Sequence, residues 1–301
     1  MPIPLITHPA YSYDFPGKHR FPMQKFALLH EYLQSIGLAT KTNTLRPGRA
    51  KHEFLQTAHC ADYISRFCEG HLSDKEVRRL GLPWSKGLVR RTVISPAGTL
   101  LAAHYALNNG IACHLAGGTH HAHYDFASGF CIFNDLAITA KTLLSAGLVN
   151  KVLIFDLDVH QGDGTARILE HTPEVFTCSI HCAKNFPARK ATSDLDVNLA
   201  VGMADDDYLK IVTDTLAQLI EQQQPDLILY DAGVDVYADD PLGLLNISLE
   251  GIRLRDHSVL KQARDAGVPI MTVIGGGYDK DQKALARRHA IAVEEAYTVF
   301  G

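Results

Sequence analysis

Several features of secreted, membrane-bound and nucleic-acid-binding proteins are missing from this 301-residue sequence. No uninterrupted apolar run approaches the roughly 18 residues that a membrane-spanning helix requires. The first residues lack the basic start and apolar centre of a signal peptide. The six cysteines form no C-x-x-C pair and are typical of free thiols in a reducing compartment. A net charge of −4 gives no excess positive charge for nucleic acid or anionic membranes. We therefore expect a cytoplasmic protein with no direct nucleic-acid binding and no membrane attachment.

Short apolar segments alternate with amphipathic segments along most of the chain. Continuous apolar strands that alternate with helices are typical of a parallel sheet covered on both faces. No linker, repeat or low-complexity segment interrupts the pattern, which predicts one α/β domain over residues 1–301. Two earlier helices are expected at 24–36 and 59–69, with a less regular connector at 83–96. The expected strands are 111–115, 152–155, 175–180, 227–230 and 268–274, and the expected helices are 97–109, 135–146, 205–224, 249–266 and 280–299.

Polar clusters follow each of these five strands. Ligands of such sheets bind beyond the carboxyl ends of the strands. The clusters therefore predict one site, built at one edge of the sheet. They are GGTHH at 117–121, DLDVHQGD at 156–163, SIHC at 179–182, DAGVDVYADD at 231–240 and GGGY at 275–278.

The cluster at 156–163 has the composition of a metal site. Asp156, Asp158 and His160 alternate in an extended chain and point to one side. Two carboxylates and an imidazole repel each other or compete for protons unless a cation lies between them. Asp158 and His160 are the candidate ligands, and Asp240 is the best candidate for the third, although a solvated turn before Pro241 is a fair alternative. Two Asp and one His leave room for water, as in catalytic Zn²⁺ sites, and Fe²⁺ accepts the same ligands.

Two other features complete the candidate site. His120 and His121 follow two glycines, which for an isolated pair would favour a surface loop. Asp156 and Asp163 are available to pair with them and raise their basicity. Tyr278 follows three glycines and either packs in an ordinary way or donates a hydrogen bond to an oxyanion.

Taken together, these motifs resemble the zinc-dependent histone deacetylase family over nearly the whole chain. The resemblance is nearest to the class IV branch and its short prokaryotic relatives. It implies a three-layer arginase/deacetylase-like fold with a central, mostly parallel sheet of about eight strands. It also implies removal of acetyl or longer acyl groups from lysine side chains of proteins, peptides or small molecules, with release of acetate. The motifs are KHRFPM at 18–23, GGTHHA at 117–122, SGFCIFND at 128–135, DLDVHQGDG at 156–164, DPLG at 240–243 and GGGY at 275–278.

Carried over by position, the resemblance implies a role for each residue. Zn²⁺ would be held by Asp158, His160 and Asp240. His120 would pair with Asp156, and His121 would pair with Asp163 and act as the base, while Tyr278 would polarise the substrate carbonyl. Gly129, Phe130 and Phe186 would line the acyl-lysine tunnel. A structural K⁺ would bind at Asp156, Asp158, His160, Ser179 and Ile180.

The sequence departs from relatives with other substrates. The acidic residue that selects acetylpolyamines would lie about seven positions after the third ligand, where this chain has Ile247. No tail or insertion of the kind that recruits corepressors is present. Arginase-like ureohydrolases need a further Asp where this chain has Gly162, which disfavours a two-metal site. A catalytically inactive acyl-lysine-binding module is the remaining alternative, and the complete set of chemical residues argues against it.

Overall fold

A single eight-stranded sheet forms the centre of the computed structural model, which describes residues 2–301. The strand order is β2-β1-β3-β8-β7-β4-β5-β6, and every neighbouring pair runs parallel. This arrangement confirms the predicted parallel sheet of about eight strands. The strands are β1 (Leu5–Ile6), β2 (Thr44–Leu45), β3 (Ile111–His114), β4 (Val152–Asp156), β5 (Val175–Cys182), β6 (Leu195–Leu199), β7 (Leu227–Asp231) and β8 (Ile270–Val273).

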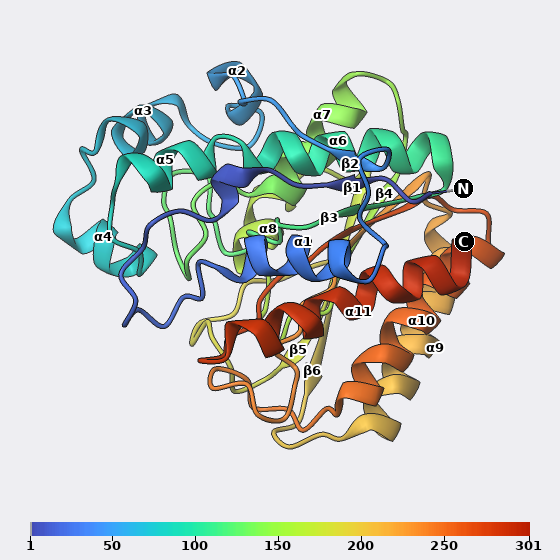
Figure 1. The fold of residues 1–301 in the computed structure, drawn as a ribbon. Helices are drawn as coiled ribbons and strands as arrows, with labels where there is room; N and C mark the ends of the chain where they lie inside the picture. Colours follow the sequence, from blue (N-terminus) through green and yellow to red (C-terminus); the bar gives the residue numbers. More distant parts are fainter. Residues whose placement is uncertain (1) are drawn as a thin grey trace.

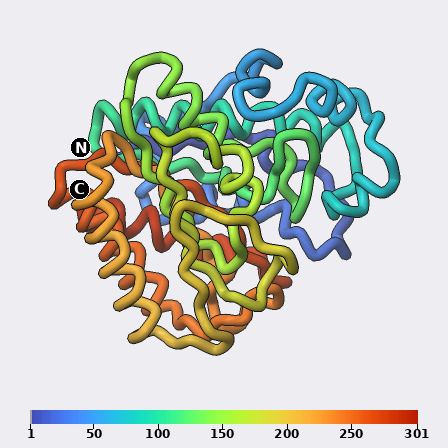
Figure 2. Tube along the Cα trace, turned by 180° about the vertical axis from the view of Figure 1, so that it is seen from behind, coloured from blue at the N-terminus to red at the C-terminus, as the bar shows by residue number. Residues whose placement is uncertain are grey.

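Helices cover both faces of the sheet and produce three layers (Figure 1). On one face α1, α11, α10 and α9 pack side by side, and on the other α6, α7 and α8 do so, an arrangement also visible from behind (Figure 2). The short helices α3, α4 and α5 lie beyond one end of α6 (Figure 1). The helices are α1 (Lys25–Ser35), α2 (His52–Leu55), α3 (Ala61–Glu69), α4 (Asp74–Leu80), α5 (Lys86–Thr92), α6 (Ser95–Asn109), α7 (Asp135–Ser145), α8 (Asp163–Leu169), α9 (Asp205–Gln223), α10 (Leu249–Asp265) and α11 (Gln282–Phe300).

The central strands are mostly apolar because both of their faces are covered. Every residue of β3, β4, β7 and β8 is buried, whereas the edge strand β6 is mostly half-buried. Burial on both faces explains why these strands appear in the sequence as continuous apolar runs without alternation. None of the helices within residues 2–301 combines the length and hydrophobicity needed to cross a membrane.

The structure adds short elements that the sequence pattern did not predict. The connector predicted at 83–96 contains α5, which begins where the Ser85 side chain accepts a hydrogen bond from the Leu88 amide. Helix α4 begins with a capping box formed by Ser73 and Glu76. Strands β1 and β2 have two residues each, too few to show a periodic pattern.

A buried ion pair within α10, between Arg255 and Asp256, supports the loop that follows β7. Arg255 is fully buried and donates hydrogen bonds to the carbonyl oxygen of Gly233, at 2.6 Å, and to Asp256, at 2.9 Å. The Tyr230 hydroxyl also donates to Asp256, at 2.5 Å. The guanidinium group thus holds the backbone just beyond the carboxyl end of β7 in one position.

Replacing Arg255 with Leu should lower the free energy of unfolding by about 3–5 kcal/mol, because a buried carboxylate would lose its charge partner. Urea-induced unfolding followed by circular dichroism measures the change. Arg264→Leu is the control on the same helix, since Arg264 is exposed and its pairing with Asp265 should contribute at most about 1 kcal/mol. If both substitutions lowered the free energy of unfolding equally, Arg255 would not have the proposed role of holding the backbone after β7.

Candidate functional site

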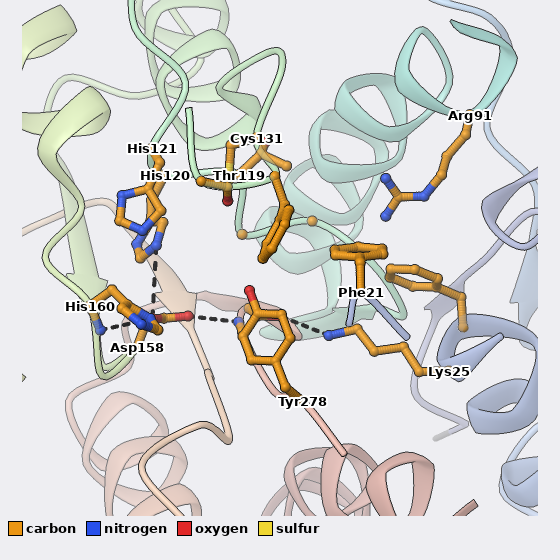
Figure 3. Close-up of a pocket in the computed structure, with 17 residues that line it drawn as sticks. Phe21, Lys25, Arg91, Thr119, His120, His121, Cys131, Asp158, His160 and Tyr278 are labelled. Atoms are coloured by element: carbon orange, nitrogen blue, oxygen red, sulfur yellow. Dashed lines mark hydrogen bonds and ion pairs between the residues drawn. The ribbon is translucent and has the colours of Figure 1, made fainter. Parts of the chain in front are cut away.

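The loops after β3, β4 and β8 meet at the carboxyl edge of the sheet and line a narrow cavity. Figure 3 shows His120, His121, Asp158 and His160 on one side of this cavity and Lys25 and Arg91 on the other, with Tyr278 between them. Phe130 and Cys131, from the loop before α7, complete the wall. Three of the five strand ends predicted from the sequence therefore line this cavity.

Three buried side chains form the candidate metal centre: Asp158, His160 and Asp235. Their ligand atoms all lie within 4.8 Å of one another. The Nδ1 atom of His160 is 2.9 Å from Oδ1 of Asp158 and 3.1 Å from Oδ2 of Asp235. Asp158 and Asp235 are at most 1% exposed, so water cannot screen the repulsion between their charges.

The electrostatics of this group suit a divalent cation. Burial, together with the neighbouring charge of Asp158, raises the pKa of Asp235. Two buried carboxylates and an imidazole are a donor set that Zn²⁺ and Fe²⁺ accept. Gly276 completes the enclosure: its amide donates to Asp158 at 2.6 Å, and a Cβ atom there would lie 2.1 Å from Asp235 Oδ2. Only glycine leaves this space free, so the residues present fit a bound metal.

Asp240, the third ligand expected from the sequence, is not part of this group. Its carboxylate instead accepts hydrogen bonds from the amides of Tyr278, at 2.7 Å, and Leu242, at 2.9 Å. Asp240 therefore positions the backbone of Tyr278. Turns at Tyr237 and Asp240 place Asp240 beside the group, since the charges of Asp235 and His160 both act on its carboxyl, whose pKa burial raises to about 7. Its role as the third metal ligand stays a prediction.

Each histidine of the adjacent pair is bonded to a buried carboxylate. His120 Nδ1 is 2.7 Å from Asp156, and His121 Nδ1 is 2.7 Å from Asp163. The structure thus places both pairs as expected from the sequence. A third histidine was missed: His123 Nε2 lies 3.1 Å from the second oxygen of Asp163. The carboxylates leave Nε2 of His120 and His121 free for the cavity.

The two histidines of the pair have opposite protonation preferences. Burial alone would lower the pKa of His120, but Asp156 and Asp158 outweigh it and hold the pKa well above its usual value. Burial and the charge of His120 lower the pKa of His121 to about 4, although Asp163 acts in the other direction. His120 is therefore a cation and His121 a neutral base at neutral pH.

Asn134 and Asp135, at the start of α7, fix the loop that carries the two histidines. Asp135 accepts hydrogen bonds from the amides of Gly118, at 3.2 Å, and Thr119, at 2.8 Å. The Asn134 side chain donates to the carbonyl oxygen of Ala122 at 3.2 Å. Both side chains are fully buried. The sequence analysis included these residues in a motif without assigning them this role.

Gly129, Phe130 and Phe186 lie where the tunnel was expected. The Phe186 ring centroid is 4.8 Å from that of His121, and the Phe130 centroid is 5.8 Å from that of Tyr278. Gly129 adopts a φ of +52°, and a Cβ atom there would lie 2.6 Å from the His121 ring. The wall beside the base therefore requires glycine.

Lys25 lies beneath the glycine loop that precedes Tyr278, a position that the sequence did not reveal. Its Nζ atom donates to the carbonyl oxygens of Gly275, at 3.3 Å, and Gly277, at 3.2 Å. Burial lowers the pKa of Lys25 to about 8, although Asp235 opposes this effect. The ammonium group holds the loop from the side opposite the metal group (Figure 3).

The residues expected to bind a monovalent cation are adjacent. Asp156 and Ser179 face each other across β4 and β5, and Ile180 follows in β5. The Ser179 hydroxyl lies 3.0 Å from His181 Nδ1. Asp231 lies close to Asp156 and His120, and both of its carboxylate oxygens lack hydrogen-bond partners among the described residues. Burial and the charge of Asp156 raise its pKa well above the usual range.

Comparison with known proteins relates this site to a family. The model of the histone deacetylase domain matches residues 19–294. The chain is 46% identical over 300 residues to an uncharacterized protein of Picosynechococcus sp., with 100% of both chains covered. It is 29% identical to histone deacetylase 2 of Arabidopsis thaliana, covering 97% of this chain and 78% of the relative. It is 30% identical to the acetoin utilization protein AcuC of Staphylococcus aureus, covering 89% and 75%.

Substitution of the two aspartates should distinguish their roles. After loading with Zn²⁺ and removal of free metal, the unaltered protein should retain about one metal ion per chain, and Asp240→Ala should lose most of it, because a catalytic Zn²⁺ site needs three protein ligands. Asp235→Ala should keep more metal than Asp240→Ala. Elemental analysis by mass spectrometry measures the content, and full retention by Asp240→Ala with loss by Asp235→Ala would instead assign Asp235 as the third ligand.

Proposed function

The chain belongs to the histone deacetylase family, and on this basis we propose that it hydrolyses acyl-lysine amides with Zn²⁺ held by Asp158, His160 and Asp240. Metal-dependent deacetylation of acetyl-lysine is the activity of this family and of this protein. The observation that carries the proposal is the buried group of Asp158, His160 and Asp235, with Asp240 beside it, next to the two His–Asp pairs. When bound, the metal supplies Lewis-acid polarisation and lowers the pKa of water.

His121 is the proposed general base. Asp163 occupies its Nδ1 atom, so Nε2 accepts the proton from the attacking water. The same Nε2–H then protonates the leaving lysine amine. His120 stays protonated through its bond to Asp156 and stabilises the negative charge that develops on the substrate. The products are the free lysine side chain and acetate, or a longer carboxylate if the tunnel admits one.

Tyr278 is the proposed donor to the substrate oxygen. Burial and the nearby carboxylates of Asp235 and Asp158 hold its pKa well above the usual value, so the hydroxyl stays protonated and able to donate. Asp240 fixes the backbone amide of Tyr278, and Lys25 fixes the preceding glycines. These contacts hold the hydroxyl in place before the substrate enters, so little reorganisation is needed during the reaction.

The remaining proposals concern the setting of the reaction. We propose one catalytic domain over residues 1–301 with a structural K⁺ at Asp156, Asp158, His160, Ser179 and Ile180. The position that selects polyamines lies about seven residues after Asp240, where this chain has Ile247, which is not acidic. Protein or peptide acyl-lysine is therefore favoured over acetylpolyamine. All six cysteines are free, which supports a cytoplasmic location.

Replacing Tyr278 with Phe removes one hydroxyl and should reduce kcat by a factor of about 10²–10³, with the metal retained. Release of acetate from an acetyl-lysine peptide, with and without a chelator, measures the activity. Tyr105→Phe is the control, since Tyr105 lies on α6 outside the cavity and should keep full activity. Full turnover by Tyr278→Phe would remove the proposed donor, and no acetate release by the unaltered metal-loaded protein would reject the proposed function.

The loss of activity at low pH should reflect protonation of His121. The base works only when unprotonated, and its pKa is lowered from 6.5 to about 4. Activity should therefore persist below pH 6.5 and fall as the pH approaches 4. Because Asp163 raises the pKa of His121, Asp163→Asn should move the loss of activity to still lower pH. The substitution should also reduce kcat. The profile of kcat/KM with an uncharged substrate tests this, and an upward shift in Asp163→Asn would contradict it.

A further inference from the structure

The outer opening of the cavity carries positive charge. We define the mouth as the residues that surround this opening, and it contains four cationic side chains. None of the residues lining it within the described part of the chain is acidic. Between the cations lies an apolar surface that includes Phe186 and Leu244, which are 45% and 43% exposed. The cations of the mouth are Arg20, Arg78, Arg79 and Lys184.

These four cations come from three separate segments of the chain. Arg20 lies in the loop before α1, Arg78 and Arg79 form the last turn of α4, and Lys184 follows β5. All four are exposed, and none forms an ion pair within residues 2–301. Other cations of the chain are paired, such as Arg66 with Asp62 and Glu76. The charges of the mouth are therefore available to a ligand.

Two of the four are held in place by aromatic rings. The Arg20 guanidinium lies 5.0 Å from the Phe130 ring centroid, at the tunnel wall. The Arg79 guanidinium lies 3.8 Å from the Phe126 ring centroid, and its Nε donates to the carbonyl oxygen of Ala127 at 3.1 Å. Stacking keeps these charges at the opening and lowers the entropy cost of using them to bind a ligand.

The positive charge is local, because the whole chain has a net charge of −4. A concave surface lined by one sign of charge concentrates ligands of the opposite sign and repels ligands of the same sign. Any acyl-lysine that reaches His121 must pass this opening, since the mouth and the inner cavity share His121, His160 and Tyr278. The residues on either side of the acylated lysine must therefore lie against the four cations.

We propose that the mouth selects acyl-lysines that are flanked by Asp and Glu in a protein or peptide, and disfavours those flanked by Lys and Arg. The proposal rests on the proposed acyl-lysine hydrolysis and specifies its substrate class. A nucleic acid is a weaker candidate for this surface, because the cations surround one opening and do not form an extended track along the molecule. The same charge also disfavours cationic polyamines.

Three acetyl-lysine peptides of equal length test the proposal, with flanking residues that are acidic, neutral or basic. The metal-loaded protein should show kcat/KM in the order acidic, neutral, basic, with acidic exceeding basic by about tenfold or more at low salt. The difference should shrink as salt is added, because the charges of the mouth are exposed to solvent. Acetate release from all three peptides at equal kcat/KM, or a preference for basic flanks, would overturn the proposal.

Reversing the charge of two cations of the mouth tests whether these residues cause the preference among the three peptides. Arg78→Glu/Lys184→Glu should abolish or invert the order of the three peptides, while kcat for a small uncharged acetyl-lysine amide stays unchanged. Lys151→Glu/Lys210→Glu changes the net charge equally, away from the mouth, and should preserve the order. An unchanged order in the first variant would overturn the proposal, as would inhibition by a single-stranded oligonucleotide that exceeds inhibition by the acidic peptide. Absence of acetate from every peptide would instead reject the underlying deacetylase activity.

Discussion

Repulsion between two buried carboxylates is the constraint around which the site is arranged. Asp158 and Asp235 both contact His160 and are out of contact with water, and a cation bound beside them would offset this repulsion. The pairing of β4 with β7 brings them together, because the register places Asp156 opposite Asp231 at the two strand ends. The same strand end supplies Asp156 to His120. One pair of adjacent strands thus positions both the metal ligands and the charged histidine, while Arg255 and Gly276 hold the surrounding backbone.

The sequence predicts the layered fold well because its physical cause is simple. Strands such as β4 and β7 are buried on both faces and are apolar up to the aspartate that ends each of them at the carboxyl edge. The order of the strands and the existence of β1, β2 and β6 could not be predicted. Two-residue strands carry no periodic pattern, and the half-buried β6 lacks the apolar run that marks the central strands.

The two aspartates after β7 show where spacing along the chain stops being informative. The carboxylate of Asp235 contacts His160, whereas that of Asp240 accepts hydrogen bonds from two backbone amides, and the spacing predicts neither contact. His123 and Lys25 were missed for a related reason, because each acts through a contact with residues far away in the sequence. The cations of the mouth lie on segments from Arg20 to Lys184, so only the folded chain shows that they surround one opening.

The central claim is that one metal ion is held by Asp158, His160 and Asp240 beside the paired histidines. Anomalous diffraction at the zinc absorption edge, from crystals of the metal-loaded protein, tests it most directly. We expect one strong peak within bonding distance of these three side chains. A peak at Asp235 that leaves Asp240 without metal, or a second peak of equal strength among His120, Asp156 and Asp231, would contradict it.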